Sequence, residues 1–298
     1  MKLLVTGAWQ CTSEQLNQIE KMGHSIVFMQ NEKDELPCKC EEVEGIICNG
    51  LFLHHSIEKF TALKFIQLTS AGFDRVPMEY VEKKGIKIYN ARGVYSIPMA
   101  EYALSGVLSM YKQSRFFYEN QKNKVWEKNR EVLELCKKTV CIVGCGSVGT
   151  ECAKRFSAFG CEVVGVDLYP REDSAYKKIY GLEELDACLP NSDVVVLTLP
   201  LTEQTYHMIN QTRFNNMKYV AVLVNIARGK IVEEKALLQA LDNKLLGAVL
   251  DVFIEEPLNA NSLLWQKQNV IITPHNSFVG DGNLERLYKV IIENLEMN

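Results

Sequence analysis

Three polar side chains suited to acid–base or anion chemistry follow apolar runs in the second half of the chain. Arg228 comes just after the run 220–225, Asp251 closes the run 247–250, and His275 closes the run 270–274. A guanidinium binds a carboxylate through two parallel hydrogen bonds, and an imidazole gives or takes a proton near neutral pH. Ligands of open α/β sheets bind at the carboxyl ends of strands. The pattern therefore predicts proton transfer on a small acid.

A glycine-rich stretch, Gly144-Cys145-Gly146-Ser147-Val148-Gly149, predicts a second site. It follows the β-branched run 138–143 and precedes a helical pattern that ends near Gly160. In a βαβ nucleotide fold the first glycine permits a tight turn, the second lets the backbone approach a pyrophosphate, and the third lets the helix pack on the strand. The start of the helix supplies N–H donors. We therefore predict a dinucleotide site whose contacts are Gly144, Gly146, Ser147, Val148 and Gly149.

The identity of the dinucleotide depends on the next apolar run, 162–166, which leads to Asp167. An acid at this position accepts hydrogen bonds from both hydroxyls of the adenosine ribose and repels a 2′-phosphate. Asp167 therefore favours NAD over NADP as the cofactor. Arg171 follows a few residues later and leaves acceptance of NADP open.

The elements that must position these residues fall into two groups along the 298-residue chain. The first group is five short expected strands, at 3–5, 25–28, 45–48, 65–68 and 86–89. A long expected helix at 99–119 leads to six further strands, at 139–143, 161–166, 193–199, 219–225, 247–252 and 269–272. A helix with a strong apolar face is expected at 277–298, and it can return to the first group.

We therefore predict an α/β protein with two doubly wound domains. Residues 99–276 are expected to form a Rossmann NAD-binding domain. Residues 1–98 and 277–298 are expected to form a smaller, flavodoxin-like substrate domain built from both ends of the chain. Two crossings of the chain between the domains predict a hinge over a cleft.

Composition limits the classes of protein to be considered. A net charge of −4 without a basic run gives no footprint for nucleic acid or an anionic membrane, and no long uninterrupted apolar stretch is present. We expect a cytoplasmic protein with no nucleic-acid or membrane partner. The ten cysteines are scattered, which favours reduced thiols over disulfides. Cys38 and Cys40 lack further ligands, so no metal is expected, and Cys145 is expected to be partly exposed and oxidisable.

Ordered motifs carry a family resemblance over nearly the whole chain. They are SAGFD at 70–74, PMAE at 98–101, the glycine stretch, LPLT at 199–202, NIARG at 225–229, DVF at 251–253 with Glu256-Pro257, and TPH at 273–275. The chain resembles the D-isomer-specific 2-hydroxyacid dehydrogenases, NAD-dependent oxidoreductases that act on 2-keto and D-2-hydroxy acids. The resemblance implies Arg228, Glu256 and His275 as catalytic residues, with Arg228 also binding the substrate carboxylate and His275 also contacting the cofactor.

The resemblance further implies contacts for both ligands. For the cofactor it adds Leu199, Pro200, Thr205, Ile226 and Ala227. Asp251 either orients the nicotinamide carboxamide or only caps a turn. For the substrate it assigns the carboxylate to Ser70, Ala71 and Gly72, and places Asn49 and Gly50 beside the side chain. No Arg or Lys stands in 49–52, which favours a small or apolar 2-keto acid over a phosphorylated one.

Two departures from the family pattern bear on substrate identity rather than on reaction type. Asn276 stands where the family usually has an aliphatic residue, and Thr198 where many members have histidine. The family is commonly dimeric, and the aromatics at 116–118 and Trp126 offer surface for a homodimer, although core packing explains them nearly as well. The alternative function is an NAD-sensing binding protein of the same fold without significant turnover. Which acid is used, the direction of flux and any regulation stay open.

Overall fold

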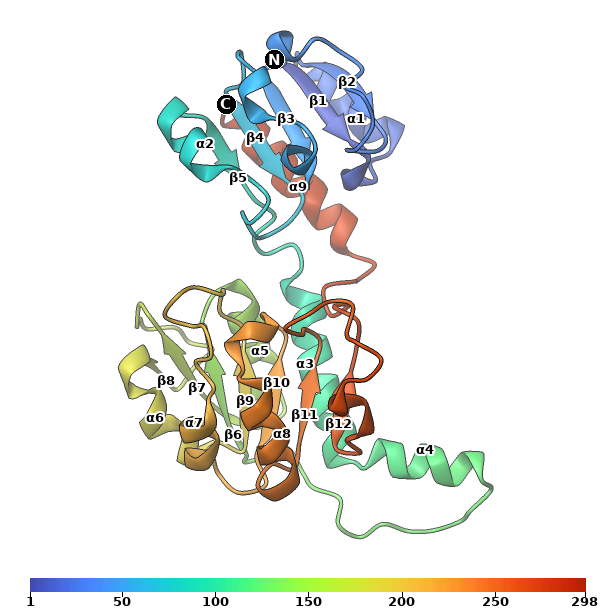
Figure 1. Ribbon diagram of the computed structural model, residues 1–298, viewed down its shortest axis with the longest axis vertical. Coiled ribbons are helices and arrows are strands. Elements are labelled where there is room, and N and C mark those ends of the chain that lie inside the picture. Colours follow the sequence, from blue (N-terminus) through green and yellow to red (C-terminus); the bar gives the residue numbers. More distant parts are fainter. The chain divides into compact units, whose positions relative to one another are not determined.

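The computed structural model describes residues 1–298, which fold as two compact units (Figure 1). Unit 1 comprises Met1–Tyr95 and Gly280–Asn298, and unit 2 comprises Ser96–Val279. The predicted domain limits, 98/99 and 276/277, lie close to these divisions. Each unit contains a parallel sheet with helices packed on it, which confirms the predicted α/β class with two doubly wound domains.

Unit 1 is built on a five-stranded parallel sheet in the order β2-β1-β3-β4-β5, which is the flavodoxin-like order. All five strands were predicted from the sequence; they are β1 Lys2–Thr6, β2 Ser25–Met29, β3 Gly45–Cys48, β4 Phe65–Leu68 and β5 Lys87–Tyr89. The central strands β3 and β4 are buried at every position because both faces of the sheet are covered.

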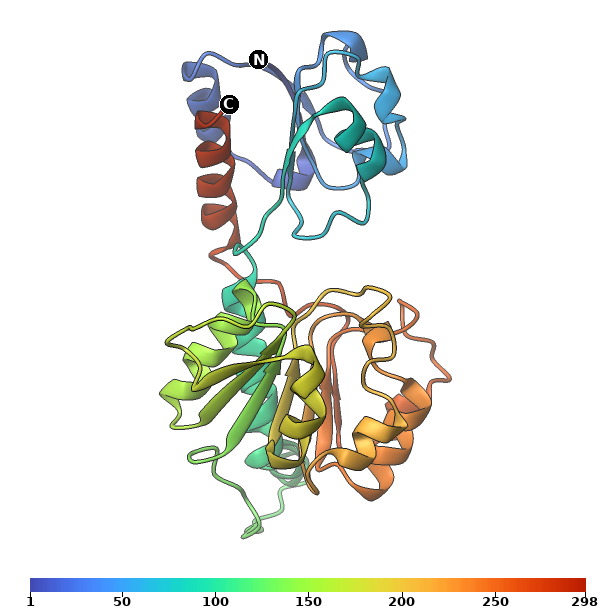
Figure 2. The ribbon, with the colours of Figure 1, turned by 90° about the vertical axis from the view of Figure 1, so that its left-hand side faces the viewer.

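The helices of unit 1 cover the two faces of that sheet. α1 (Ser13–Lys21) and α9 (Asn283–Glu296) lie side by side on one face, and α2 (Met78–Lys84) lies on the other (Figure 2). Apolar side chains of α9 at steps of four pack with β1; they are Leu287, Ile291 and Leu295. The helix is shorter than the predicted span of 277–298. The last part of the chain thus completes the core of the first part.

Unit 2 is built on a seven-stranded parallel sheet in the order β12-β11-β10-β9-β6-β7-β8. The strands are β6 Thr139–Val143, β7 Glu162–Asp167, β8 Lys178–Gly181, β9 Val194–Leu197, β10 Val222–Asn225, β11 Gly247–Leu250 and β12 Val270–Ile272. This is the Rossmann order with one strand added, and its connectivity reverses between β6 and β9. The predicted count of six was wrong because β8, an edge strand paired only with β7, was missed.

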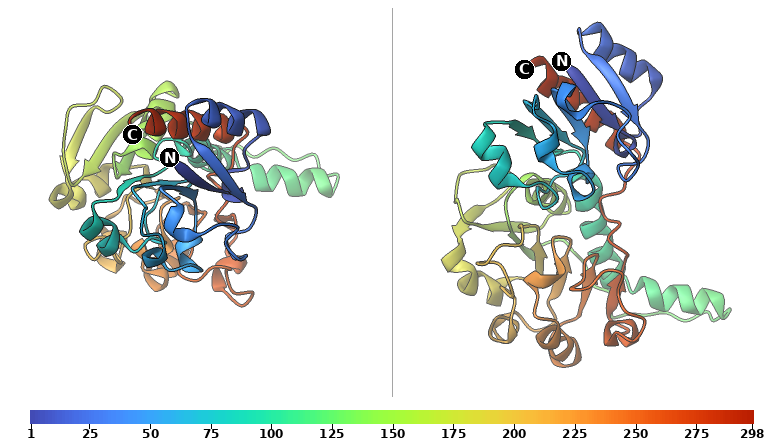
Figure 3. Two further views of the ribbon diagram at one scale, coloured as in Figure 1. Left: turned by 90° about the horizontal axis from the view of Figure 1, so that it is seen from above. Right: turned by 45° about the horizontal axis from the view of Figure 1, so that its top comes forward.

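Helices cover both faces of the sheet of unit 2 (Figure 3). α3 (Ser96–Tyr111) and α5 (Ser147–Ala158) pack on one face, whereas α6 (Leu185–Cys188), α7 (Gln211–Asn216) and α8 (Glu234–Asn243) pack on the other. The predicted single helix at 99–119 was wrong. It is two helices, α3 and α4 (Ser114–Lys122), because Gln113 adopts a left-handed conformation with φ of 54°.

α4 and the segment that follows it project from the body of unit 2 (Figure 1). Large aromatic side chains of this arm face solvent: Phe117 is 39% exposed, Tyr118 64% and Trp126 97%. Core packing, the alternative explanation for these aromatics, therefore does not apply to them. We call residues 114–132 the arm below.

Candidate active site

The glycine stretch has the geometry that a dinucleotide pyrophosphate requires. Gly144 has a φ of 98°, and a Cβ there would lie 2.7 Å from the backbone nitrogen of Leu199. A Cβ on Gly149 would lie 2.1 Å from the carbonyl oxygen of Gly144. A Cβ on Gly146, in contrast, would meet no atom within 4 Å. The outer two glycines are thus required by the fold itself, whereas Gly146 keeps space open in front of the helix.

The N-terminus of α5 faces that open space without a side-chain cap. α5 begins at Ser147, and no side chain of the capping residue Gly146 accepts from its first N–H groups. Uncapped N–H groups at a helix start, with the positive end of the helix dipole, bind phosphate oxygens. The residues present therefore fit a dinucleotide, with Gly146, Ser147 and Val148 as the cradle.

Asp167 ends β7 beside the glycine loop. Its Oδ2 accepts a hydrogen bond of 2.6 Å from the backbone N–H of Cys145, and its Oδ1 accepts one of 3.0 Å from Tyr169. The guanidinium of Arg171 donates to the carbonyl oxygen of Cys145 and lies 3.6 Å from Asp173. The acid and the arginine thus both bond to the backbone of Cys145 in the glycine loop.

The expectation that Cys145 is partly exposed was wrong. The residue is fully buried, since its side chain packs under the loop against Gly165 and Tyr176. Burial raises the pKa of the Cys145 thiol to about 12, so the thiol stays protonated and unreactive near neutral pH. Cys145 is a small apolar core residue of the glycine loop.

The turn that carries Arg228 follows β10 and is shaped by a buried amide. Asn225 accepts from the backbone N–H of Ala227 at 3.1 Å and donates to the carbonyl oxygen of Arg228 at 3.0 Å. The guanidinium of Arg228 donates to the carbonyl oxygen of Ala227 at 2.7 Å. Gly229 is required here, because a Cβ would lie 2.0 Å from the carbonyl carbon of Phe253.

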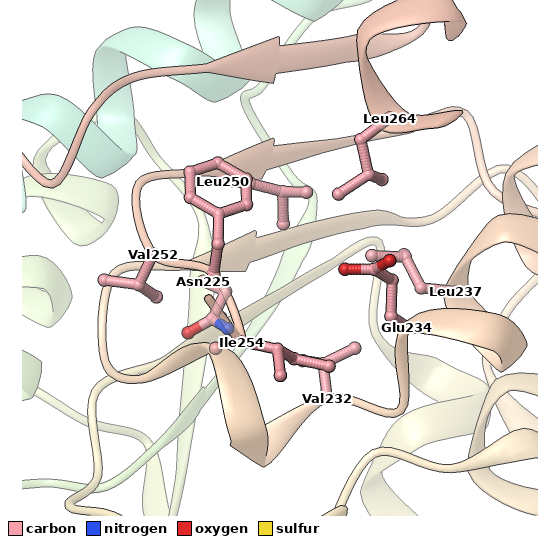
Figure 4. A pocket seen from close by; sticks show the side chains of 10 residues that line it. Asn225, Val232, Glu234, Leu237, Leu250, Val252, Ile254 and Leu264 are labelled. Atoms are coloured by element: carbon pink, nitrogen blue, oxygen red, sulfur yellow. The ribbon is translucent and has the colours of Figure 1, made fainter. Parts of the chain in front are cut away.

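Beneath this turn lies a small cavity lined by apolar side chains of unit 2, with Asn225 and Glu234 as its polar members (Figure 4). Its volume of about 20 Å³ is close to that of a single water site. The cavity is therefore a packing void behind the Arg228 turn and not a site for an organic acid.

His275 and Glu256 form a hydrogen-bonded pair. His275 Nδ1 lies 2.7 Å from Glu256 Oε2, and Glu256 Oε1 accepts from the backbone N–H of Phe253 at 3.0 Å. The pair is partly open to solvent, with side-chain exposures of 42% for His275 and 36% for Glu256. Because a carboxylate only accepts, it holds the proton on Nδ1 of a neutral imidazole. Nε2 is then the nitrogen that can exchange a proton with a ligand.

Asp251 is fully buried and bonds to the chain around His275. Its carboxylate accepts from the backbone N–H groups of Asn276 at 2.7 Å and Ser277 at 2.9 Å, and from the hydroxyl of Thr273. Of the two expected roles, this geometry supplies the cap of a turn. A contact with the nicotinamide carboxamide stays a prediction.

Two threonines in the segment after β9 make hydrogen bonds that shape this part of the site. The hydroxyl of Thr198 donates to the carbonyl oxygen of Gly144, so the threonine replaces the family's frequent histidine with a bond to the cofactor loop. The hydroxyl of Thr205 donates to the carbonyl oxygen of Pro200 at 2.8 Å and accepts from the N–H of Thr202 at 2.7 Å. Thr205 therefore shapes the turn after Leu199 and Pro200.

All of these residues of unit 2 lie at or after the carboxyl ends of six strands, β6, β7, β9, β10, β11 and β12. Parallel strands bring those ends to one edge of the sheet, at the switch in connectivity. The sequence prediction that Arg228, Asp251 and His275 share an edge with the glycine stretch is thus met by the topology. The edge combines the glycine loop, a guanidinium and a hydrogen-bonded His–Glu pair.

The expected substrate residues follow two strands of unit 1. Ser70, Ala71 and Gly72 come after β4, where Asn90 donates to the carbonyl oxygen of Ala71 at 2.6 Å. Asn49 and Gly50 come after β3. The sequence did not predict this role of Asn90, because the residue is brought to the loop only when β5 pairs with β4.

A second missed residue, Glu32, binds the other loop. Its Oε1 accepts from the backbone N–H of Asn49 at 2.7 Å and from the hydroxyl of Thr6 at 2.8 Å. Its Oε2 accepts from the backbone N–H of Gly50 at 2.7 Å. Nothing in the local sequence around Glu32 signals this role, since it depends on β1 lying between β2 and β3.

Three further observations concern other kinds of site. No group of three or more His, Cys, Asp or Glu side chains is arranged to hold a metal ion. All ten cysteines are free thiols. None of the helices has the length and apolar character needed to cross a membrane.

The strand order, glycine loop and acid of unit 2 define a Rossmann dinucleotide-binding domain with a hydrogen-bonded His–Glu pair at its ligand edge. Residues 104–277 match the family model described as "D-isomer specific 2-hydroxyacid dehydrogenase, NAD binding domain". The chain belongs to the D-isomer specific 2-hydroxyacid dehydrogenase family, and unit 2 is the domain that binds its cofactor, NAD.

Curated relatives differ in the acid they are named for. A glyoxylate reductase of Thermofilum pendens is 35% identical over 287 residues, which cover 90% of this chain and 84% of the relative. A D-3-phosphoglycerate dehydrogenase of Methanocaldococcus jannaschii is 32% identical over 280 residues. That match covers 92% of this chain but 53% of the relative, so this chain spans about half of its length.

Solved structures share the fold over almost the whole chain. A D-isomer specific 2-hydroxyacid dehydrogenase family protein from Aeromonas salmonicida is 30% identical with a TM-score of 0.83, covering 99% of this chain and 94% of that one. A D-lactate dehydrogenase from Aquifex aeolicus, solved with NAD and lactic acid, is 28% identical with a TM-score of 0.78 and the same coverage of both chains.

Proposed function

We propose that this protein is an NAD-dependent oxidoreductase that interconverts a small 2-keto acid and the corresponding D-2-hydroxy acid. The observation that carries the proposal is the 2.7 Å pair of His275 and Glu256 at the same strand edge as the glycine loop and Arg228. This arrangement supplies an acid–base group and an anion-binding group beside a hydride-carrying cofactor. The ten free thiols support a reducing compartment such as the cytoplasm.

When NADH is bound, it supplies the hydride that goes to the keto carbon. Arg228 binds the substrate carboxylate through its planar guanidinium. The backbone N–H groups of Ser70, Ala71 and Gly72 are proposed as anion-binding donors of unit 1 in their own right. His275 donates the Nε2 proton to the keto oxygen as the carbon is reduced, and takes a proton back in the oxidation. Glu256 keeps a proton on Nδ1 and stabilises the imidazolium that precedes proton transfer.

The substrate we propose carries a single negative charge. Glu32 already occupies the N–H groups of Asn49 and Gly50 with a carboxylate, in a loop that has no Arg or Lys. The Cδ of Arg75 lies 3.6 Å from the Cβ position of Gly50, so the guanidinium bonded to it brings one positive charge near the loop, which the negative charge of Glu32 offsets. A phosphate or sulfonate at this loop would meet a negative side chain and two N–H groups that are already bonded. Small acids such as glyoxylate, pyruvate and hydroxypyruvate fit better.

The test is the decrease of NADH absorbance with these three acids and with 3-phosphohydroxypyruvate. We expect kcat/KM to be at least about tenfold higher for the best monoanionic acid than for 3-phosphohydroxypyruvate. Glu32→Gln should reduce the ratio of these two values of kcat/KM about threefold. The latter figure follows from the repulsion of about 0.7 kcal/mol between two like charges roughly 6 Å apart in water. The control is Glu35→Gln, which removes one negative charge from an exposed glutamate three residues after Glu32. Preference of the wild type for 3-phosphohydroxypyruvate would overturn the assignment.

We further propose that the protein forms a homodimer through the arm. The support is the exposed aromatic surface formed by Phe117, Tyr118 and Trp126. Monomeric proteins rarely expose several large aromatic side chains together, whereas interfaces are enriched in them. Beside them the arm is hollowed by a groove of about 590 Å³ that Phe117 and Tyr118 help to line. A second copy, with the same aromatics, is the occupant that we propose.

A further inference from the structure

His275 has a backbone conformation that is unfavourable for a residue with a side chain. Its φ is 51°, in the left-handed region that glycine prefers. The backbone N–H of His275 donates to the carbonyl oxygens of Asp251 at 2.8 Å and Thr273 at 3.0 Å. A conformation of this kind persists only where the surroundings hold it, and such positions cluster at active sites.

The strongest of these surroundings is the carboxylate of Asp251. The two residues after His275 point their backbone N–H groups at it: Asn276 donates to Oδ1 at 2.7 Å and Ser277 to Oδ2 at 2.9 Å. Asp251 has no exposed surface, so water does not compete for these bonds. Residues on both sides of His275 thus donate hydrogen bonds to one buried carboxylate, and His275 is the middle residue of the loop 273–277.

A third donor connects this carboxylate to α3. The hydroxyl of Thr273 lies within hydrogen-bonding distance of both Asp251 Oδ1 and the hydroxyl oxygen of Tyr102, the latter at 2.7 Å. A threonine hydroxyl has one proton, and an ionised carboxylate only accepts. Thr273 therefore donates to Asp251 and accepts from Tyr102. Burial raises the pKa of the Tyr102 hydroxyl, and the negative charge of Asp251 adds to this, so the phenol remains a donor.

We propose that Tyr102, Thr273 and Asp251 are positioning residues that hold the ring of His275 against Glu256. The proposal rests on the acid–base role of His275 proposed above. It gives Asp251 a function that does not need contact with the cofactor, and it assigns a function to Tyr102 and Thr273. The chain of hydrogen bonds runs from Tyr102 on α3 to the residues that flank His275.

The experiment compares three variants of the full-length protein with a control. Tyr102→Phe removes the first donor, Thr273→Val removes the hydroxyl, and Thr273→Ser retains it. Tyr111→Phe is the control, since Tyr111 is a buried tyrosine of the same helix with no part in the chain of bonds. For each protein we would record kcat and KM, the Kd of NADH by fluorescence, and the ¹⁵N spectrum of the histidine rings, assigned with His275→Gln.

We expect kcat to fall about tenfold in Thr273→Val and about threefold in Tyr102→Phe, by the usual strength of hydrogen bonds to ionised and neutral groups. The Kd of NADH should stay within about twofold, and Thr273→Ser should behave as the wild type. The Nδ1 resonance of His275 should move or broaden in the first two variants and not in Tyr111→Phe. An unchanged His275 spectrum in Thr273→Val would overturn the proposal, as would a loss confined to NADH affinity. The spectrum decides this even if no 2-keto acid is turned over, which would instead refute the proposed function.

Discussion

Gly146→Ala should separate cofactor binding from folding. The backbone of Gly146 has a φ of −72°, which alanine adopts without strain, and no atom lies within 4 Å of the Cβ position. The free energy of unfolding should therefore change by less than about 1 kcal/mol. The methyl group would, however, fill the space before the N-terminus of α5 into which the pyrophosphate must come. We expect the Kd of NADH to rise at least about tenfold, which corresponds to about 1.4 kcal/mol.

Gly149→Ala is the matched comparison, because its Cβ would lie 2.1 Å from the carbonyl oxygen of Gly144. Backbone atoms must then move, and overpacking of this kind costs about 3 kcal/mol. For a domain of this size the Tm should fall by about 6–12 °C. The assays are thermal unfolding by circular dichroism and NADH fluorescence titration. The reasoning is refuted if Gly146→Ala unfolds as easily as Gly149→Ala, or if it binds NADH as the wild type does.

The remaining predictions concern cofactor choice and assembly. Asp167→Ser should raise kcat/KM with NADPH at least about tenfold relative to kcat/KM with NADH. The substitution removes the carboxylate that repels a 2′-phosphate, while Arg171 stays beside the loop. An unchanged ratio in steady-state kinetics would contradict the role of Asp167. Trp126→Ser, at the most exposed aromatic residue of the arm, should shift the sedimentation coefficient from dimer towards monomer at micromolar concentration. Exposed Trp265→Ser is the control, and a wild-type monomer would refute the dimer.

The fold could be predicted well where both faces of a strand are buried. Runs such as 140–143 and 222–224 are continuously apolar, and the residues after them had to share one edge of the sheet. β8 escaped prediction because it is a short edge strand in which Lys178 and Tyr180 alternate with buried positions. The break between α3 and α4 escaped because a left-handed glutamine carries no sequence signal.

Within the candidate site, motifs predicted which residues follow the strand ends but not how they are held. Glu32 and Asn90 act on loops that follow other strands, so their roles appear only once the strands are ordered. Cys145 was placed wrongly, because the direction of its side chain depends on the space that Gly165 leaves under the loop. The left-handed conformation of His275 and the buried carboxylate beneath it likewise result from tertiary contacts.

The central claim is that His275 transfers a proton during reduction of a 2-keto acid by NADH. The most direct measurement is the rate of NADH oxidation over the panel of acids for the wild type and His275→Gln, with His24→Gln as the control. We predict turnover by the wild type, a fall in kcat of about a thousandfold in His275→Gln, and a Kd for NADH within about twofold. Unchanged kcat in His275→Gln would contradict the claim. NADH binding by a wild type that reduces none of these acids would favour the NAD-sensing alternative.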